Sequence, residues 1–575
     1  MYKTIFSHLG KYKKQAILTP LMIIGEVAME VTIPAVMALI IDNGVKQGDI
    51  GYVVKMGGVM MLMAMLSLVF GAAAARFSAV CSMGFAQNLR SSLFHKVQDF
   101  SFANVDRFST ASLTTRLTTD VTNIQNAFMM FVRAAFRSPI MLVCATIMAV
   151  RANASLSAVF IFAIPILGGA IAFIISKAHP RFEKMLRLYD SMNGRIQENL
   201  IGIRVVKAFA REEYEKKRFN ESTDEVRTAQ FMAEKLVVMG MPIMQLVMYA
   251  SITLILWFGG HMAVNREIFT GELSSFIMYV GQILMSLMML SMLFIMFVVS
   301  RASVQRVYEV LKEVPAIKGR ENSEIEADDG SVRFENVSFS YFDDMNNLAL
   351  SSIDLEIKSG ETIGIIGGTG SSKTSLVQLI PRLYDATEGD VIVGGHNVKD
   401  YTLESLRNNV AMVLQKNVLF SGTIKENLRW GNENATDEEI IDACKSACAH
   451  DFIMGFPDGY DTDLGQGGVN VSGGQKQRLC IARALLKKPK IIILDDSTSA
   501  VDTATDSSIR QAFREKLGDT TTIIIAQRIS SVKDADRIIV MDNGRITDIG
   551  THEQLLETSS IYREVYDSQQ KGADE

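Results

Sequence analysis

Long apolar stretches are confined to the first 300 positions of the chain. A helix needs about 20 mostly apolar residues to cross the hydrocarbon core of a bilayer. Six stretches of this kind occur, at 16–41, 53–80, 127–150, 156–175, 236–264 and 273–299. The first is not followed by a small-residue cleavage site, so we interpret it as a retained span and not as a signal peptide. The pattern predicts six membrane-spanning helices.

The connections between these stretches differ in length and charge. The second and fourth are long and basic, at 90–116 and 177–235, whereas the odd-numbered ones are short and carry isolated charges. Basic residues favour the cytoplasmic side of a membrane. We therefore expect both termini and the long connections in the cytoplasm. The segment 177–235 contains few helix breakers, which predicts helices that continue beyond the bilayer.

The pattern changes after residue 301. The stretch 318–330 is polar and predicts a linker. Short β-branched runs then alternate with helical stretches, which is typical of an α/β domain. The predicted strands include 362–366, 491–494, 521–525 and 537–541. We divide the chain into an all-α membrane domain at 1–312, a linker at 313–330 and a cytoplasmic α/β domain at 331–575.

Composition agrees with a membrane protein joined to a soluble part. Hydrophobic residues make up 48% of the 575 residues, and the net charge is −5. A groove for DNA needs a concentrated excess of Lys and Arg, which this sequence does not show, so we expect no nucleic-acid partner. The five cysteines form no CxxC pair, so we interpret them as small apolar residues and not as zinc ligands or disulfides.

A phosphate-binding loop is predicted directly after the strand at 362–366. The pattern G-x-x-x-x-G-K-[ST] is matched except that Ser372 replaces its last glycine, which is expected to strain the loop. Lys373 is expected to reach the β and γ phosphates of ATP, and Thr374 to hold Mg²⁺. The nucleotide-binding residues expected here are Gly367, Gly368, Thr369, Gly370, Ser371, Ser372, Lys373, Thr374 and Ser375.

Two further motifs follow in the same domain. The strand at 491–494 ends in Asp495 and Asp496, and a carboxylate at that position can hold the Mg²⁺ of a nucleotide. Between the phosphate loop and this strand, Val471 precedes the run Ser472, Gly473, Gly474 and Gln475, which opens a helical stretch. In this order the motifs resemble a half-transporter of the ATP-binding cassette exporter family. The resemblance covers essentially the whole chain, although Val471 stands where leucine is usual.

The resemblance implies roles for residues outside the phosphate loop. Tyr341 would stack on adenine, and Gln415 would sense Mg²⁺ and the γ-phosphate, while Asp495 holds the metal. Asp502, at the end of the loop 499–502, would communicate between two sites. A core aromatic for Tyr341 and a solvated loop residue for Gln415 are the alternatives. Ser472, Gly473, Gly474 and Gln475 would complete the ATP site of a second cassette that pairs head to tail with this one.

Two catalytic positions depart from the family pattern. Asp496 stands where the family has glutamate, and Gln527 stands where it has histidine. Both changes are expected to slow phosphoryl transfer, which depends on positioning and electrostatics. Gln466, in the loop before Val471, replaces an acidic residue of some relatives. The pattern favours a heterodimer with a second, non-identical half-transporter that holds the competent site; a slow homodimer is the alternative.

Charged and methionine side chains within the spans are candidates for cargo binding. Glu26 and Glu30 are four residues apart and share a helix face, where they would either attract cationic cargo or pair with Arg133 or Arg137. In the last span, methionines share one face and would form either an adaptable binding surface or a packing stripe. They are Met278, Met285, Met289, Met292 and Met296, of which the middle three are the cargo candidates.

These observations predict an ATP- and Mg²⁺-dependent multi-pass exporter of amphipathic or drug-like small molecules in a cell membrane, which we expect to be a bacterial inner or plasma membrane. Translocation of lipids, peptides or siderophores is an alternative, as is a regulatory subunit that binds ATP without transporting. By the resemblance, turns around Ser109–Leu113 and Ala210–Tyr214 would couple the membrane domain to the ATPase domains.

Overall fold

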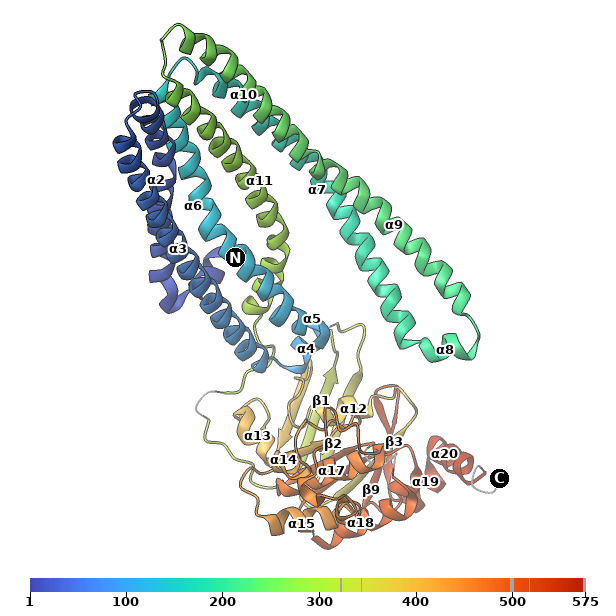
Figure 1. The fold of residues 1–575 in the computed structure, drawn as a ribbon. Coiled ribbons are helices and arrows are strands. Elements are labelled where there is room, and N and C mark those ends of the chain that lie inside the picture. Colours follow the sequence, from blue (N-terminus) through green and yellow to red (C-terminus); the bar gives the residue numbers. More distant parts are fainter. Residues whose placement is uncertain (321–322, 343, 497–500, 517, 572–575) are drawn as a thin grey trace. The chain divides into compact units, whose positions relative to one another are not determined.

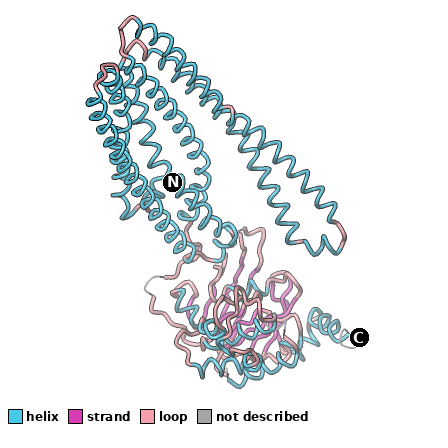
Figure 2. Tube along the Cα trace, in the orientation of Figure 1, coloured by secondary structure: helices cyan, strands magenta, loops and turns pink. Residues whose placement is uncertain are grey.

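The computed structural model describes residues 1–320, 323–342, 344–496, 501–516 and 518–571. Residues 499 and 500, in the loop expected to communicate between ATP sites, lie outside these ranges. The chain forms two compact units: Met1–Gln98 with Thr110–Glu313, and Asp99–Ser109 with Val314–Glu575. Within the described residues the first unit is helical and the strands belong to the second (Figure 2).

The helical unit contains, among its described residues, six helices long and apolar enough to cross a membrane, which confirms the six predicted spans. Several continue far beyond the predicted limits. The elements of this unit (Figure 1) are α1 (Tyr2–Ser7), η1 (Gly10–Tyr12), α2 (Lys13–Leu39), η2 (Ile40–Val45), α3 (Ile50–Gln98), α5 (Thr110–Thr115), η3 (Arg116–Asp120), α6 (Val121–Ala152), α7 (Ala158–Ile201), α8 (Ile203–Ala208), α9 (Glu212–Val238), α10 (Gly240–Val264) and α11 (Thr270–Lys312).

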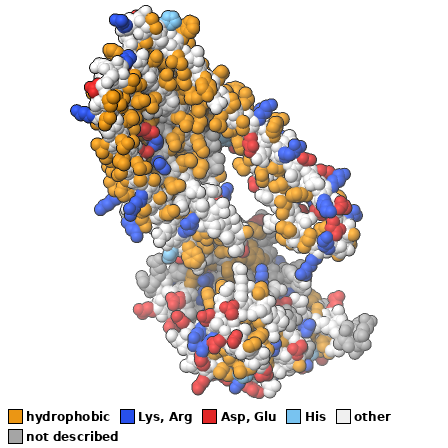
Figure 3. Space-filling view, viewed as in Figure 1, with side chains coloured by type: hydrophobic (Ala, Val, Ile, Leu, Met, Phe, Trp, Pro, Cys, Tyr) orange, Lys and Arg blue, Asp and Glu red, His pale blue; other side chains and the backbone are white. Residues whose placement is uncertain are grey.

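Helices α2, α3, α6 and α11 pack together, and α7 pairs with α9 and α10 as a long arm (Figure 1). The bundle is fixed by apolar packing and by a few polar contacts. The Tyr279 hydroxyl donates to the Val31 carbonyl at 3.2 Å, and the Gly271 N–H donates to Asp42 at 2.9 Å. On the visible face of this unit, apolar side chains cover much of the surface, and charges gather at the α8 end of the arm (Figure 3). That distribution suits a bilayer around the bundle and water around the end of the arm.

The second unit is an α/β unit, as the alternation of strands and helices predicts, and it contains two sheets. An antiparallel sheet has the order β2-β1-β4-β5, and a mostly parallel sheet has the order β10-β9-β3-β8-β7-β6. The strands are β1 (Val332–Phe339), β2 (Leu350–Ile357), β3 (Thr362–Gly367), β4 (Glu388–Val393), β5 (His396–Asn397), β6 (Val410–Val413), β7 (Ile491–Asp495), β8 (Thr521–Ile525), β9 (Arg537–Asp542) and β10 (Arg545–Gly550).

Helices cover these sheets, and one of them comes from the other end of the sequence. Helix α4 (Phe102–Phe108), between α3 and α5 in the chain, packs with this unit. The remaining helices are α12 (Lys373–Gln378), α13 (Leu403–Asn409), α14 (Ile424–Arg429), α15 (Asp437–Ser446), α16 (His450–Met454), η4 (Gly459–Asp461), α17 (Gly473–Leu486), α18 (Thr503–Lys516), η5 (Ile529–Ser531), α19 (His552–Thr558) and α20 (Ser560–Lys571).

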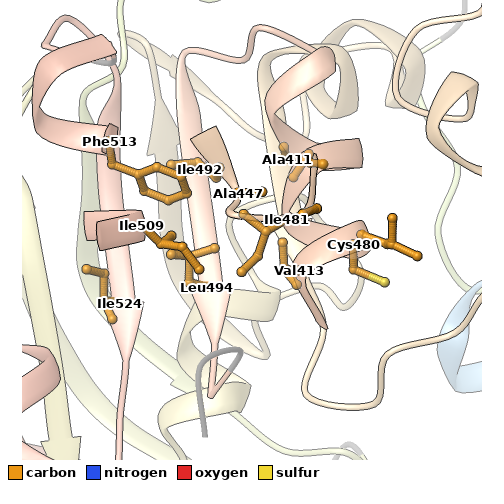
Figure 4. Close-up of a cluster of buried hydrophobic side chains, with 14 of the residues drawn as sticks. Ala411, Val413, Ala447, Cys480, Ile481, Ile492, Leu494, Ile509, Phe513 and Ile524 are labelled. Carbon is orange, nitrogen blue, oxygen red and sulfur yellow. The ribbon is translucent and has the colours of Figure 1, made fainter. Parts of the chain in front are cut away.

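A buried apolar cluster fixes the parallel sheet against α17 and α18. Figure 4 shows Ile481 of α17 beside β6 and β7, with Ile509 and Phe513 of α18 in the same cluster. The β7 side chains Ile492 and Leu494 are almost completely buried within it. Because β7 and α17 share this cluster, it holds the strand that ends in Asp495 and the helix that begins after Ser472 in a fixed relation.

Candidate nucleotide-binding site

Three neighbouring strands bring the predicted nucleotide residues together. Strand β3 pairs in parallel with β8, and β8 pairs in parallel with β7, so their carboxyl ends lie at one edge of the sheet. The phosphate loop follows β3, Asp495 ends β7 with Asp496 directly after it, and Gln527 follows β8. Loops at the carboxyl ends of parallel strands form the usual ligand crevice of such sheets.

Two positions of the phosphate loop favour glycine: Gly367 packs too closely for a side chain, and Ser372 has a left-handed backbone conformation. A Cβ on Gly367 would lie 2.2 Å from the Met541 carbonyl oxygen. Ser372 has φ +68° and ψ +26°, in the left-handed region, directly before α12. An L-residue other than glycine costs roughly 1–2 kcal/mol in that region. Ser372 therefore occupies a position where the backbone favours the glycine that this chain lacks.

Lys373 folds back over the loop that would hold the phosphates. Its ammonium donates to the carbonyl oxygens of Gly367 at 2.9 Å and Gly368 at 2.8 Å, and to Ser371 Oγ at 3.1 Å. Burial lowers the pKa of Lys373, while the nearby carboxylates of Asp496 and Asp495 act in the opposite direction. The charge is thus placed at the loop, ready to exchange carbonyl partners for phosphate oxygens.

Thr374 and Asp495, the two residues predicted to hold Mg²⁺ together with Gln415, contact each other. Thr374 Oγ1 donates to Asp495 Oδ1 at 2.9 Å. Asp495 is only 2% exposed, and burial raises its pKa. Within the described part of the chain, no group of three or more His, Cys, Asp or Glu side chains could hold a metal alone. A hydroxyl and a carboxylate suit Mg²⁺ that takes its other ligands from phosphate and water, so these residues fit the expected ion.

The two departing positions contact each other. Gln527 Nε2 donates to Asp496 Oδ2 at 2.8 Å, and Gln415 also hydrogen-bonds the Asp496 carboxylate. Burial raises the pKa of Asp496, while these two hydrogen bonds and the charge on Lys373 oppose that rise. Asp496 itself has φ +49°, another left-handed residue at this edge of the sheet. Asp496, Gln527 and Gln415 thus form one polar cluster.

Tyr341 lies in an aromatic group beside the phosphate-loop helix. Its hydroxyl is 2.8 Å from Ser375 Oγ in α12, and its ring makes edge contacts with Phe339 at 4.8 Å and Tyr384 at 5.1 Å between centroids. Tyr384 was not singled out from the sequence. Its hydroxyl donates to Asp106 of α4 at 2.6 Å. The aromatic group therefore connects α4 with α12.

Helix α4 lies directly before the first predicted coupling turn and belongs to the second unit. The sequence placed that turn around Ser109–Leu113, but the segment that packs with the second unit is Asp99–Ser109, and Leu113 belongs to the first unit. Asn104 fixes α4, because its side chain donates to the Val314 carbonyl at 3.1 Å and accepts from the Ala316 N–H at 2.9 Å. These contacts join positions more than 200 residues apart, which no local pattern reveals.

The Ser-Gly-Gly-Gln run begins α17 as expected. Ser472 and Gln475 form a capping box in which Ser472 Oγ accepts from the Gln475 N–H at 3.3 Å and Gln475 Oε1 accepts from the Ser472 N–H at 2.9 Å. Gly473 and Gly474 are the first helical residues. Asp502 has a similar role at α18, where its carboxylate accepts from the backbone and the hydroxyl of Thr505.

The charges within the spans are joined by Arg137. Its guanidinium bonds Glu26 at very short range and Glu30 Oε2 at 2.8 Å, so Arg137 makes the pairing that the sequence left open between Arg133 and Arg137. Glu26 is 7% exposed, and one of its oxygens has no hydrogen-bond partner; the Glu30 side chain is 34% exposed. The candidate methionines of α11 are exposed within the single chain: Met285, Met289 and Met292.

Comparisons with known proteins agree with this architecture. A family model described as the ABC transporter transmembrane region matches residues 16–288, and one described as ABC transporter matches residues 350–499. The chain is 38% identical over 566 residues to YfiB of Bacillus subtilis, an uncharacterized ABC transporter ATP-binding protein, with 98% of each chain covered. This chain belongs to the ABC transporter family.

Further likenesses place this ABC transporter among exporters. It is 30% identical over 568 residues to a putative multidrug export ATP-binding/permease protein of B. subtilis, YgaD, covering 96% of this chain and 97% of the relative. A solved bacterial Atm1-family ABC exporter with ATP bound has a TM-score of 0.82 and 25% identity, covering 98% and 99% of the two chains. The chain is an ABC exporter half-transporter with a membrane-spanning region and a cassette that binds ATP.

Proposed function

We propose that this ABC exporter uses ATP hydrolysis to move amphipathic or drug-like small molecules across the cell membrane, as one subunit of a heterodimer with a degenerate and a competent ATP site. The multidrug export named for one relative supports the cargo class. The observation that carries the asymmetric model is the Asp496–Gln527 contact at the catalytic positions. We propose the domain limits that the sequence predicts: a membrane domain at 1–312, a linker at 313–330 and a nucleotide-binding domain at 331–575.

The chemistry of the two catalytic positions supports a slow site. Asp496 is one methylene shorter than the glutamate of the family, and its carboxylate is already bonded to Gln527 and Gln415. Gln527 donates hydrogen bonds but carries no charge to offset the γ-phosphate. Phosphoryl transfer depends on positioning and on charge stabilisation, so a site built from these two residues binds ATP and turns over slowly.

ATP and Mg²⁺ bind, in this proposal, at the loop Gly367–Ser375. Lys373 contacts phosphate, Tyr341 stacks on adenine, and Thr374, Asp495 and Gln415 surround the metal. Mg²⁺ supplies positive charge that offsets the charge of the phosphates. The capping box at Ser472 leaves the Gly473 backbone at a helix N-terminus, which suits a phosphate brought by the partner. Gly474, Gln475 and Asp502 contribute to the same shared sites.

A partner half-transporter also explains the apolar surface of the α7–α9 arm. Ile201 is 79% exposed and Phe209 is 73% exposed in the part predicted to extend into the cytoplasm, where no bilayer covers them. Monomeric soluble surfaces rarely leave such residues grouped without function. The second coupling turn predicted at Ala210–Tyr214 lies in the same region. We therefore assign this surface to a protein partner. In this proposal both termini of the chain are cytoplasmic, and the spans lie in a bacterial inner or plasma membrane.

Cargo recognition is assigned to the membrane-spanning unit. The single positive charge of Arg137 can neutralise one of the two carboxylates that it contacts. We pair it with the buried Glu26, so the partly exposed Glu30 carries the surplus negative charge. A surplus negative charge attracts cationic cargo within a span. The exposed face with Met285, Met289 and Met292 would adapt to apolar parts of different compounds.

Steady-state ATPase of purified heterodimers tests the asymmetric model. Gly473→Glu should nearly abolish hydrolysis, because this helix N-terminus completes the partner's competent site. Asp496→Ala should lower it only modestly, since it changes the slow site. Folding of each variant is checked by size-exclusion profile and thermal unfolding. Equal and complete loss of hydrolysis from both substitutions would contradict the model, and rapid hydrolysis by this chain alone, abolished by Lys373→Ala, would contradict it as well.

Two other functions are open to a direct test. Lipid, peptide or siderophore translocation changes the cargo and keeps the mechanism, whereas a regulatory ATP-binding subunit would not transport. ATP-dependent accumulation of a cationic fluorescent dye in inverted vesicles separates a drug exporter from the regulatory subunit. Absence of ATP-dependent accumulation, in vesicles whose heterodimer binds ATP, would favour the regulatory subunit.

A further inference from the structure

The last turn of the C-terminal helix holds the backbone on both sides of Arg528, directly after Gln527. Gln569 of α20 donates from Nε2 to the Gln527 carbonyl oxygen at 2.8 Å and accepts at Oε1 from the Ile529 N–H at 2.9 Å. One side-chain amide thus bridges the short segment between β8 and η5. The carboxamide matches this pair of partners, because it offers a donor and an acceptor at once.

Helix α20 is itself anchored to the cassette. Tyr562 is fully buried, and its hydroxyl lies 2.7 Å from His552 Nδ1 of α19. Tyr566 packs partly buried against the same apolar cluster that contains β7 and α17. Gln569 therefore extends from a helix that is fixed by buried side chains, so its hydrogen bonds restrain the segment between β8 and η5.

The restrained segment leads directly to the slow catalytic position. Its start is tied to the sheet, where the Ala526 N–H donates to the Ile365 carbonyl at 3.2 Å. Within this segment, Gln527 Nε2 donates to Asp496 Oδ2 at 2.8 Å. A continuous chain of contacts thus runs from α20 through Gln569 and Gln527 to Asp496.

We propose that Gln569 is a positioning residue that sets the placement of Gln527 at the nucleotide site. This proposal rests on the proposed binding of ATP at the phosphate loop, where Gln527 faces the γ-phosphate. A segment that is already restrained loses less conformational freedom when nucleotide binds, which strengthens binding without a new contact to the ligand. The C-terminal helix thereby regulates how long ATP stays on the slow site.

The test measures release of a fluorescent ATP analogue, with Mg²⁺, from the purified full-length chain. Gln569→Ala removes both hydrogen bonds and should speed release about threefold to tenfold, given the modest net strength of partly exposed hydrogen bonds. Gln569→Glu keeps an acceptor but cannot donate to the Gln527 carbonyl, so it should also speed release. The matched control is Gln570→Ala, at the exposed neighbouring position of the same turn, which should leave the rate unchanged.

A double-mutant cycle distinguishes positioning from a general structural role. If Gln569 acts through Gln527, then Gln569→Ala should add no further effect to Gln527→Ala. Additive effects, an unchanged rate in Gln569→Ala, or an equal effect of Gln570→Ala would overturn the proposal while leaving ATP binding by the wild-type chain intact. Failure of the wild-type chain to bind the analogue would instead overturn the proposed nucleotide site and this inference together.

Discussion

Arg137 pairs with two carboxylates inside the membrane-spanning unit, and replacing it is a sensitive test of what this group of three charges does. In Arg137→Gln, Glu26 and Glu30 would face each other without their shared cation. Glu26 is almost fully buried, and one of its oxygens already lacks a partner. The two remaining carboxylates would repel each other in a low-dielectric environment, which costs free energy.

The size of the effect follows from the burial of the group. Removing one member of a buried ion pair costs about 3–5 kcal/mol. We expect the lower end, about 3 kcal/mol, because the Glu30 side chain is 34% exposed and can relax toward water. For a unit of this size, that cost lowers the apparent melting temperature by at least about 5 °C.

Thermal unfolding in detergent, read from the fraction of monodisperse protein after heating, measures this change. Arg133→Gln, an exposed arginine one turn earlier on α6, is the matched control and should melt like the wild type. Neutralising all three members of the group, in Arg137→Gln with Glu26→Gln and Glu30→Gln, should recover most of the loss. If Arg137→Gln melts at the same temperature as Arg133→Gln, the ion pair does not stabilise the bundle and the reasoning is wrong.

The same group separates structure from cargo recognition. Glu30→Gln leaves the Glu26–Arg137 pair intact and removes only the surplus charge. It should therefore lower the melting temperature little, while weakening the stimulation of ATPase by cationic compounds and leaving basal ATPase unchanged. Unchanged stimulation by cations, in a folded Glu30→Gln heterodimer, would assign the whole group to structure.

Two further predictions concern the nucleotide-binding unit. Because Ser372 has φ +68°, where glycine is favoured, Ser372→Gly should not lower the stability measured by thermal unfolding. The control Ser508→Gly, within helix α18, should cost about 0.5–1 kcal/mol of stability. Equal losses from both substitutions would contradict the strain at Ser372. Tyr384→Phe removes the donor and Asp106→Ala removes the acceptor of the bond between α4 and the aromatic group, so each should reduce cargo-stimulated ATPase while leaving ATP affinity intact. A loss of ATP affinity as large as that of Tyr341→Ala would show that Tyr384 supports adenine binding and not coupling.

Patterns within the sequence determined the fold class and predicted most residues of the candidate site. Apolar stretches of membrane-spanning length are local properties, and they predicted the six spans. The strand predicted at 521–525 matches β8 residue for residue, because a β-branched run between turn residues has few alternatives. The phosphate loop, Asp495 and the Ser472 motif are contiguous patterns whose chemistry depends on the order of neighbouring residues, so they could be found without coordinates.

Tertiary structure decided the contacts between residues far apart in the chain. Helical spacing placed Glu26 and Glu30 on one face but could not choose between Arg133 and Arg137, since that choice depends on how α2 packs against α6. The helix α4 contact with Tyr384 joins positions 278 residues apart. Gln569 is one of several polar residues at the end of an amphipathic helix, and only the seating of α20 directs it to Gln527. Local periodicity determines which residues form an element and which face they share, whereas partners across elements are set by packing of the whole unit.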